Sequence, residues 1–331
     1  MKIIDRKFLN VTTPSCHAST LAIFNNKPVY AWFGGSREGA PDVAIYVECE
    51  GKTYTIGDDK MMPYWNPILF TYLDKLYLFV KLGKFCDSWA TIIYDISDIL
   101  DPNFDIKKAR YQILLAGLNG PVKTKPIDCG GLVYCGSSVE TIIDWTSYCE
   151  IYKIKNGTFN YFDRSRPLVV PKEIYSDPYY GKRQTMGIIQ MALYRDYNNE
   201  YSPLSAFFRS SRGLGKIYHS TSEINDFGRL MWSDPVPTNF PNPNSGVDCV
   251  STKDNRLFLV YNPSEMFRYP LVINELDMKL NVIDSIVIQD KTDGKTNTEE
   301  LSYPYLIEND GKLHLTYTFG RSRIEKVTLE I

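Results

Sequence analysis

The stretch HASTLAIFNNKPVYAWFGGSREGAPDVAIYV, residues 17–47, contains two apolar runs joined by a polar turn, followed by a loop rich in glycine and charge. The turn, Asn25-Asn26, lies between LAIF and PVYAWF, an arrangement typical of a β-hairpin. A histidine and three charged residues lie at the ends of these runs: His17, Arg37, Glu38 and Asp42. Because glycine lets the backbone come close, such strand ends favour a polar pocket on an all-β scaffold.

The same hairpin pattern recurs along the chain. Six copies of an apolar run, a polar turn and a second run alternating apolar and aromatic residues span 21–33, 68–80, 126–138, 191–211, 249–262 and 305–319. Their spacing of about 50–70 residues corresponds to about six units in 331 residues. Units of this size predict an all-β fold, a six-bladed β-propeller that occupies residues 1–331 as one domain. A β-sandwich is the alternative, although it needs no such long period.

The end of the chain suggests how this ring closes. The run RIEKVTLEI, residues 323–331, alternates in the manner of a strand. We expect it to pair with the first unit.

Composition agrees with a β fold and excludes several classes of partner. Aromatic residues make up 14% of the chain, with 24 Tyr, a profile of strands and turns. The net charge of −2, with dispersed Lys and Arg, argues against a nucleic-acid groove or a polybasic membrane patch. The seven cysteines have no CxxC spacing, so we expect reduced, mostly buried thiols. The three histidines lack metal-site spacing, and we predict no metal or other cofactor.

We expect no targeting signal in the sequence as given. No apolar window approaches 18 residues, so no membrane-spanning segment is expected. The N-terminus carries charges at Asp5, Arg6 and Lys7 and lacks the apolar region of a signal peptide. We therefore expect a cytoplasmic protein, or a periplasmic or surface protein if a signal has been removed. The oligomeric state stays open.

Several segments carry a family resemblance. They are HAST…AWFGGSREGAPDVAIY (17–46), WNPILF (65–70), KPI…GSSVET (125–141), FFRSS (207–211), PNPNSGVD (241–248) and SYPYLIENDGKLHLTYTFGR (302–321). Together they resemble the sialidase (neuraminidase) superfamily, in particular its bacterial branch of BNR-repeat proteins. Residues 220–235 resemble a degenerate Asp-box, the blade-folding turn of that superfamily, at Asp226, Gly228 and Trp232.

The resemblance implies a site that binds an acidic sugar. In this superfamily three arginines hold the substrate carboxylate, because guanidinium offers a rigid bidentate fork to a planar anion. Arg209 and Arg268 match the second and third of these, and Arg37 resembles an additional arginine that flanks the sugar. The position of the first is occupied by His17, which could serve if neighbouring carboxylates raised its pKa. Other candidate binding residues are Lys81, Lys125 and Arg321 for charge, and Asn66 and Asp248 for hydroxyls.

The resemblance also implies catalytic roles. The superfamily uses a tyrosine nucleophile, whose position Tyr303 matches. The glutamate expected to take the tyrosine proton is replaced by Gln190, so Glu300 is the candidate activator, with Glu140 as a second. Asp42 resembles the general acid.

Each of these residues also has a structural interpretation. Asp42 could cap a turn, Tyr303 could pack, and His17 could be a satisfied structural histidine.

Three functions remain open. The leading hypothesis is an exo-glycosidase that releases terminal acidic 2-keto sugars, sialic acid or a related nonulosonic or ulosonic acid such as Kdo, from an acidic glycan. The second is a glycan-binding propeller without catalysis, which Gln190 favours. The third is a glycosidase or lyase that uses His17 on a uronate-containing polysaccharide.

Overall fold

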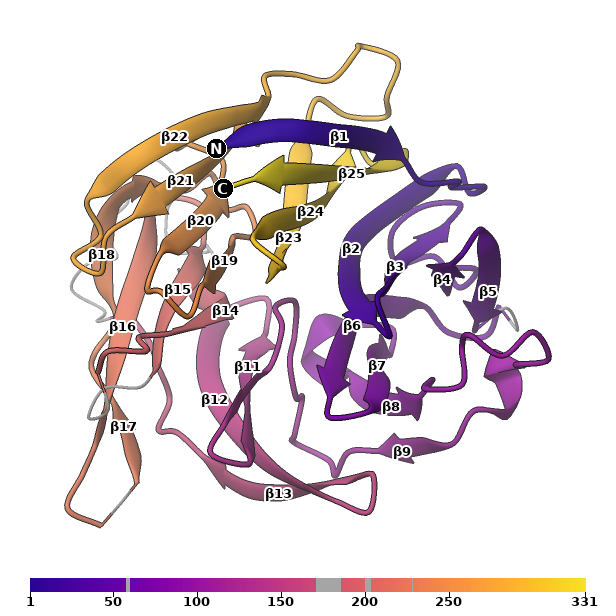
Figure 1. Cartoon of the computed structure of the whole chain (residues 1–331), viewed down its shortest axis with the longest axis horizontal. Coiled ribbons are helices and arrows are strands. Elements are labelled where there is room, and N and C mark those ends of the chain that lie inside the picture. The colour runs from indigo at the N-terminus through magenta and orange to yellow at the C-terminus, as the bar shows by residue number, and fades with distance from the viewer. Residues whose placement is uncertain (58–59, 171–185, 200–203, 228) are drawn as a thin grey trace.

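The computed structural model describes residues 1–57, 60–170, 186–199, 204–227 and 229–331. The described chain is all β, apart from the 3-10 helices η1 (Cys86–Ser88) and η2 (Ile106–Lys108). The sheets are arranged around a common centre (Figure 1).

Three four-stranded sheets follow chain order, each antiparallel throughout. They are β2 (Ser15–Phe24), β3 (Lys27–Gly35), β4 (Ala44–Cys49) and β5 (Lys52–Ile56); β6 (Tyr64–Tyr72), β7 (Lys75–Leu82), β8 (Ala90–Asp95) and β9 (Tyr111–Ile113); and β19 (Asp248–Ser251), β20 (Leu257–Tyr261), β21 (Leu271–Leu276) and β22 (Val282–Gln289). Their first strands, β2, β6 and β19, lie nearest the centre (Figure 1).

A nine-stranded sheet consists of two antiparallel halves that a short parallel pairing of β12 with β14 joins. The first half contains β10 (Ile127–Cys129), β11 (Leu132–Glu140), β12 (Asp144–Lys155) and β13 (Thr158–Arg164). The second contains β14 (Met186–Arg195), β15 (Leu204–Ser210), β16 (Lys216–Ile224), β17 (Leu230–Trp232) and β18 (Val236–Pro241).

The last sheet corrects one expectation. It contains β23 (Leu301–Asn309), β24 (Lys312–Phe319), β25 (Arg323–Glu330) and β1 (Lys2–Phe8). The prediction that residues 323–331 pair with the first unit is wrong, because a short connection keeps β25 beside β24. The N-terminal strand β1 crosses instead and pairs with β25, which brings the two chain ends together (Figure 1).

All six predicted hairpins are present as strand pairs. Their turns use residues that tolerate positive φ, such as Asn25 (48°), Asn26 (61°), Asp310 (51°) and Gly311 (70°). Residues 200–203, in the fourth predicted hairpin, lie outside the described chain.

Six hydrophobic cores lie between neighbouring sheets or halves of the nine-stranded sheet. In order around the molecule, they contain Ile45 and Leu78, Phe79 and Phe159, Cys149 and Phe208, Phe207 and Leu259, Ile273 and Leu315, and Trp32 and Ile324. The last core joins the final sheet to the first. Because burial of apolar area is the main favourable contribution to folding, these faces hold the sheets in place.

The two ends of the strands differ. At the end we call the turn end, tight turns join β2 to β3, β12 to β13 and β23 to β24. At the opposite end, the loop end, longer loops join β3 to β4, β7 to β8 and β20 to β21, and the innermost strands begin.

Two further predictions concern the described chain. All seven cysteines are free and most are buried, as predicted. No described helix has the length and apolar character needed to cross a membrane.

Candidate functional site

Four innermost strands carry the same irregularity near the loop end. In β2, β6, β14 and β23 the pairing register shifts, which marks a β-bulge. At each bulge one residue has a positive φ: Ala18 (52°), Asn66 (39°), Gln190 (56°) and Tyr303 (52°). A bulge bends its strand and re-aims a side chain. The repeated bulges therefore place corresponding residues of different sheets around one centre.

The hydroxyl of Tyr303, in β23, is hydrogen-bonded to Gln190 of β14, so two of the bulged strands are in contact here. The guanidinium of Arg209, in β15, donates to it over 2.8 Å, and the Gln190 amide nitrogen donates over 3.0 Å. The same Arg209 nitrogen also donates to the Gln190 carbonyl oxygen, at 3.2 Å. Arg209 further lies over the Trp145 ring, 5.4 Å from its centroid. The tyrosine, the arginine and the glutamine thus form one buried triad.

Arg268 is held beside this triad by Asn244. Arg209 donates through Nε to the Asn244 side-chain oxygen at 2.9 Å, and Arg268 donates to the Asn244 backbone oxygen at 2.8 Å. Burial, and then the charge of Arg209, lower the pKa of Arg268. Two largely buried guanidinium groups that share Asn244 favour an anion beside them.

Within the described chain, Glu300 is bonded to arginine and serine side chains and not to the Tyr303 hydroxyl. It accepts from Arg321 Nε and from the Ser302 hydroxyl, each at 2.7 Å, and lies 3.5 Å from Arg268. Burial raises its pKa, but the two arginines and the serine outweigh burial, so the pKa lies below its usual range. Glu300 therefore serves to position Arg321 and Arg268 in this state.

Arg321 completes a group of three arginines around Tyr303. It lies in the connection between β24 and β25, and pairs with Glu300 and with Glu38 of the first sheet. Its pKa is raised, because the charges of the two carboxylates outweigh burial.

His17 is buried next to the triad. Its ring centroid lies 4.1 Å from that of Tyr303, and its Nδ1 is 3.0 Å from the Thr318 hydroxyl. Within the described chain its Nε2 has no hydrogen-bond partner. Burial, and then Arg321 and Arg268, lower its pKa well below its usual value. The expectation that neighbouring carboxylates raise this pKa is wrong, because burial, and then the charges of the arginines, lower it.

Arg37 and Asp42 lie in the loop between β3 and β4. Arg37 is exposed, and Asp42 is partly exposed. Asp42 accepts from the Ser36 hydroxyl at 2.8 Å and from its backbone amide at 2.9 Å. Its pKa is lowered, chiefly by the hydroxyl. This arrangement caps the loop.

Lys125 and Asp248 form a pair between sheets. The lysine lies 2.8 Å from both carboxylate oxygens, and Asp248 also accepts from the backbone amide of Leu306 at 2.8 Å. Asp248 is fully buried. The pair joins three innermost segments, and the ligand-binding role predicted for each residue stays a prediction.

Asn66 and Lys81 occupy the second sheet. Asn66 is buried at the bulge of β6. Lys81 is buried, donates to the Thr91 hydroxyl at 2.9 Å, and has its pKa lowered by burial to about 7. It is a weaker source of positive charge than the arginines.

Sequence reasoning missed Lys123. It is buried, donates to the backbone oxygens of Val247 and Pro304, and has its pKa lowered by burial to about 8. Gly246 separates it from Gln190: a Cβ built there would lie 3.3 Å from Lys123 Cε and 3.2 Å from Gln190 Oε1. The Lys-Thr-Lys run at 123–125 was the available signal, but its spacing does not show which lysine lies near Tyr303.

The resemblance of residues 220–235 to an Asp-box stays a prediction. β16 and β17 pair here, and Trp232 is buried. The side-chain oxygen of Asn225, rather than that of Asp226, accepts hydrogen bonds from the backbone amides of Phe227 and Arg229. Gly228 lies outside the described residues.

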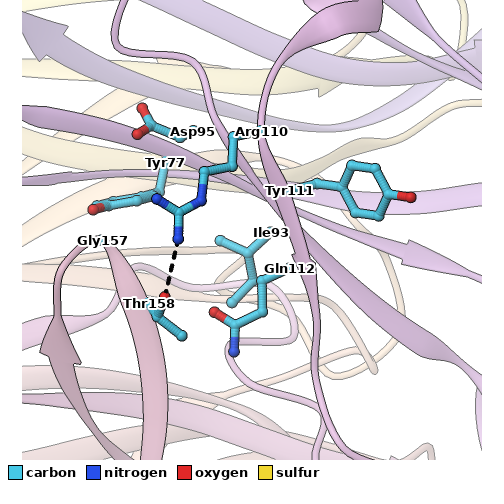
Figure 2. Close-up of a pocket in the computed structure, with 8 residues that line it drawn as sticks. All are labelled: Tyr77, Ile93, Asp95, Arg110, Tyr111, Gln112, Gly157 and Thr158. Carbon is cyan, nitrogen blue, oxygen red and sulfur yellow. Dashed lines mark hydrogen bonds between the residues drawn. The ribbon is translucent and has the colours of Figure 1, made fainter.

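A separate pocket lies between β7–β9 and the turn joining β12 to β13 (Figure 2). Its volume is about 200 Å³, and Arg110 donates across it to the Thr158 hydroxyl at 3.3 Å. The lining residues are Tyr77, Ile93, Asp95, Arg110, Tyr111, Gln112, Gly157 and Thr158. None of the candidate site residues lines it. Across the described ranges, no group of three or more His, Cys, Asp or Glu side chains is arranged to hold a metal ion.

Comparison with solved structures places this fold among sialidases. The chain is similar to Trypanosoma rangeli sialidase in complex with 2,3-difluorosialic acid, with 11% identity, a TM-score of 0.61, and coverage of 95% of this chain and 54% of that one. For the same sialidase in complex with sialic acid, identity is 10%, the TM-score 0.62, and coverage 100% and 58%. The chain thus spans about half the length of these sialidase chains.

A shorter protein matches from end to end. A subtype N10 neuraminidase-like protein from the source A/little yellow-shouldered bat/Guatemala is 11% identical, with a TM-score of 0.55 and coverage of 99% of both chains. No curated protein matches the chain at a significant level. The family model of the BNR repeat-like domain matches residues 28–315. The chain has a fold similar to that of sialidases, and it belongs to the family of the BNR repeat-like domain.

Proposed function

We propose that this chain binds a terminal acidic 2-keto sugar, sialic acid or a related ulosonic acid such as Kdo, and cleaves its glycosidic bond. The observation that carries the proposal is the contact of Arg209 with the Tyr303 hydroxyl, 2.8 Å, next to Arg268. Paired guanidinium groups suit a planar carboxylate. A tyrosine nucleophile suits the same substrate, because a carboxylate nucleophile would be repelled by the sugar's own anion.

The other roles follow the family pattern. Arg209 and Arg268 hold the carboxylate, with Arg321 in place of the arginine that His17 replaces. Asp42 is the general acid, and it must leave Ser36 and gain a proton when the sugar enters. Arg37, exposed in the same loop, flanks the sugar.

The fold proposed for this activity is one six-bladed propeller domain. The six hairpins and the six cores between neighbouring strand sets support it. In such a ring the loop end of every blade contributes to one central site.

A second candidate function is glycan binding without cleavage. The Gln190 amide, 3.0 Å from the Tyr303 hydroxyl, cannot accept the phenolic proton as a carboxylate would. Glu300 is bonded to Arg321 and Ser302 instead. Both facts favour recognition over catalysis.

One experiment separates the two candidates. Sugar release is measured from a panel of sialyl, Kdo and uronate glycosides, with binding followed by calorimetry, for the natural chain and for Gln190→Glu. A glycosidase releases an acidic 2-keto sugar, and Gln190→Glu raises turnover because it supplies a base. Binding without release in either protein selects the second candidate. Uronate release that His17→Ala abolishes and Tyr303→Phe spares would contradict both.

A further inference from the structure

The pocket of Figure 2 lies at the turn end, away from the arginines around Tyr303. It is lined by Gly157 and Thr158, at the turn that joins β12 to β13, and by Tyr77, near the start of β7. Because the candidate site lies at the loop end, the pocket is a separate place for a ligand. Its volume of about 200 Å³ suits one small ring better than a nucleotide or a folded partner.

One wall of this pocket carries a buried polar group that the chain does not pair. Tyr77 is 2% exposed, and within the described chain its hydroxyl has no hydrogen-bond partner. Burial, and then the charge of Asp95, raise its pKa, so the hydroxyl keeps its proton and can both donate and accept. Since buried polar groups are nearly always hydrogen-bonded, the Tyr77 hydroxyl calls for a partner from outside the chain.

Gly157 leaves this hydroxyl open to the pocket. A Cβ built on Gly157 would lie 3.6 Å from the Tyr77 hydroxyl oxygen and 3.9 Å from Arg110 Nη1. The φ of Gly157, 72°, also favours glycine for the turn itself. The turn thus has a conformational reason for glycine, and the missing side chain keeps two polar groups uncovered.

The remaining polar groups supply both charges and both kinds of hydrogen bond. Arg110 donates to the Thr158 hydroxyl over a long 3.3 Å, the one hydrogen bond of its guanidinium within the described chain. Asp95 lies opposite Arg110, whose backbone oxygen accepts from the Asp95 amide at 2.8 Å. Among the lining residues the two charges offset each other. Such a set suits the neighbouring hydroxyls of a sugar ring, because each hydroxyl both donates and accepts.

A second pocket adjoins the first at Tyr111. This tyrosine, 61% exposed on the edge strand β9, lines both pockets, and its ring extends away from Arg110 (Figure 2). The second pocket is also about 200 Å³, with Thr55, Tyr94 and Lys107 among its lining residues. An exposed aromatic ring shared by two small hollows suits a chain of sugars, whose C–H faces pack on such rings.

We propose that the outer edge of the second sheet binds a neutral oligosaccharide, with one hexose ring beside Tyr77 and Arg110 and the next against Tyr111. A sugar chain fits better than a peptide, because β9 has three residues and offers few backbone bonds to an added strand. The inference goes beyond the proposed function and does not rest on it. A glycan held at this edge leaves the loop end free for an acidic sugar.

The test is calorimetric titration of the full chain with neutral tetrasaccharides of glucose, galactose, mannose and N-acetylglucosamine, and with their methyl glycosides. The pocket variant is Tyr77→Phe combined with Arg110→Leu. The matched control is Tyr161→Phe combined with Arg164→Leu, two exposed residues of β13 that line neither pocket. A third variant, Tyr111→Ala, removes the shared ring.

We expect at least one tetrasaccharide to bind at least about tenfold more tightly than its methyl glycoside, and Tyr111→Ala to remove this advantage. The pocket variant should weaken tetrasaccharide binding at least about tenfold, and the control less than about twofold. Thermal unfolding checks that the pocket variant folds. If it does not, Tyr77→Phe alone should weaken binding at least about threefold.

Four results would overturn the proposal. They are no binding of any tetrasaccharide by the natural chain, equal affinity for a tetrasaccharide and its methyl glycoside, equal loss in the pocket variant and the control, and binding that Arg209→Leu abolishes while the pocket variant spares it. The last result would assign the neutral sugar to the loop end. Loss of neutral-sugar binding alone leaves the proposed function standing, because acidic-sugar binding is measured separately at the loop end.

Discussion

At the turn end, strands join through short turns whose geometry depends on the turn residues themselves, as at Asn25-Asn26 and Asp310-Gly311. At the loop end, strands join through longer loops, and charged groups from distant parts of the chain are buried together. Arg209 and Tyr303, 94 residues apart, are in contact there. Local chemistry thus specifies one end, and long-range packing specifies the other.

The bulges show how the same strands serve both ends. Each begins at the loop end with a bulge and continues as a regular strand toward its turn, and the bulge residues Gln190 and Tyr303 of two of these strands are hydrogen-bonded to each other. Substitutions at the loop end should therefore change acidic-sugar binding, whereas those at the turn end should leave it unchanged.

The largest effect is expected for Tyr303→Phe. Removing the proposed nucleophile should lower turnover by about 10³-fold or more, and should lower the free energy of unfolding by about 1–3 kcal/mol because Arg209 and Gln190 lose a shared acceptor. Steady-state kinetics and urea unfolding measure the two changes. Unchanged turnover would remove Tyr303 from the mechanism, and Tyr317→Phe, in the same sheet, controls for loss of a hydroxyl.

Asp248→Asn tests the buried pair between sheets. It leaves the Lys125 ammonium without its carboxylate, and we expect the free energy of unfolding to fall by about 3–5 kcal/mol. Asp310→Asn, in an exposed turn, is the control and should cost less than about 0.5 kcal/mol. A weakened sugar affinity with stability intact would assign Asp248 to the ligand instead.

Acid should lower the free energy of unfolding, because the buried histidines become protonated when the chain unfolds. Burial lowers the pKa of His219 to about 4, and that of His17 is also low. In the unfolded chain these histidines bind a proton below about pH 6.5, whereas in the folded chain His219 does so only near pH 4. The contribution of His219 to the free energy of unfolding is therefore fully present above pH 6.5, and up to about 3 kcal/mol of it is lost as the pH falls to 4. Urea unfolding between pH 7 and 4 measures this slope. His219→Gln should flatten it; an unchanged slope would contradict the burial argument.

A pair of glycine substitutions gives the smallest effect and the sharpest contrast. Gly311 has φ 70° with no atom near a built Cβ, so Gly311→Ala should cost about 1 kcal/mol and leave sugar binding unchanged. Gly246→Ala places a methyl group 3.2 Å from Gln190 Oε1 and should weaken sugar binding severalfold. The opposite pattern would contradict the division between the two ends.

The sequence predicts the hairpins well because their signals are local. Turn residues such as Gly130-Gly131 identify strand pairs without knowledge of the rest of the chain. The predicted partner of the last strand is wrong, because the pairing of β1 with β25 joins the two ends of the chain and no local signal encodes it.

The site shows the same limit. The sequence proposes Arg209, Arg268 and Tyr303, and the structure brings them together. The sequence does not reveal that Glu300 pairs with arginines or that Lys123 is buried beside the site, because these contacts depend on three-dimensional packing.

The central claim is that the arginines around Tyr303 bind the carboxylate of an acidic sugar. Calorimetric titration with free sialic acid and Kdo, each compared with its methyl ester, tests it most directly. We predict that at least one acid binds, that its ester binds at least about 100-fold more weakly, and that Arg209→Leu abolishes the difference. Equal affinity for acid and ester, or discrimination that survives Arg209→Leu, would contradict the account.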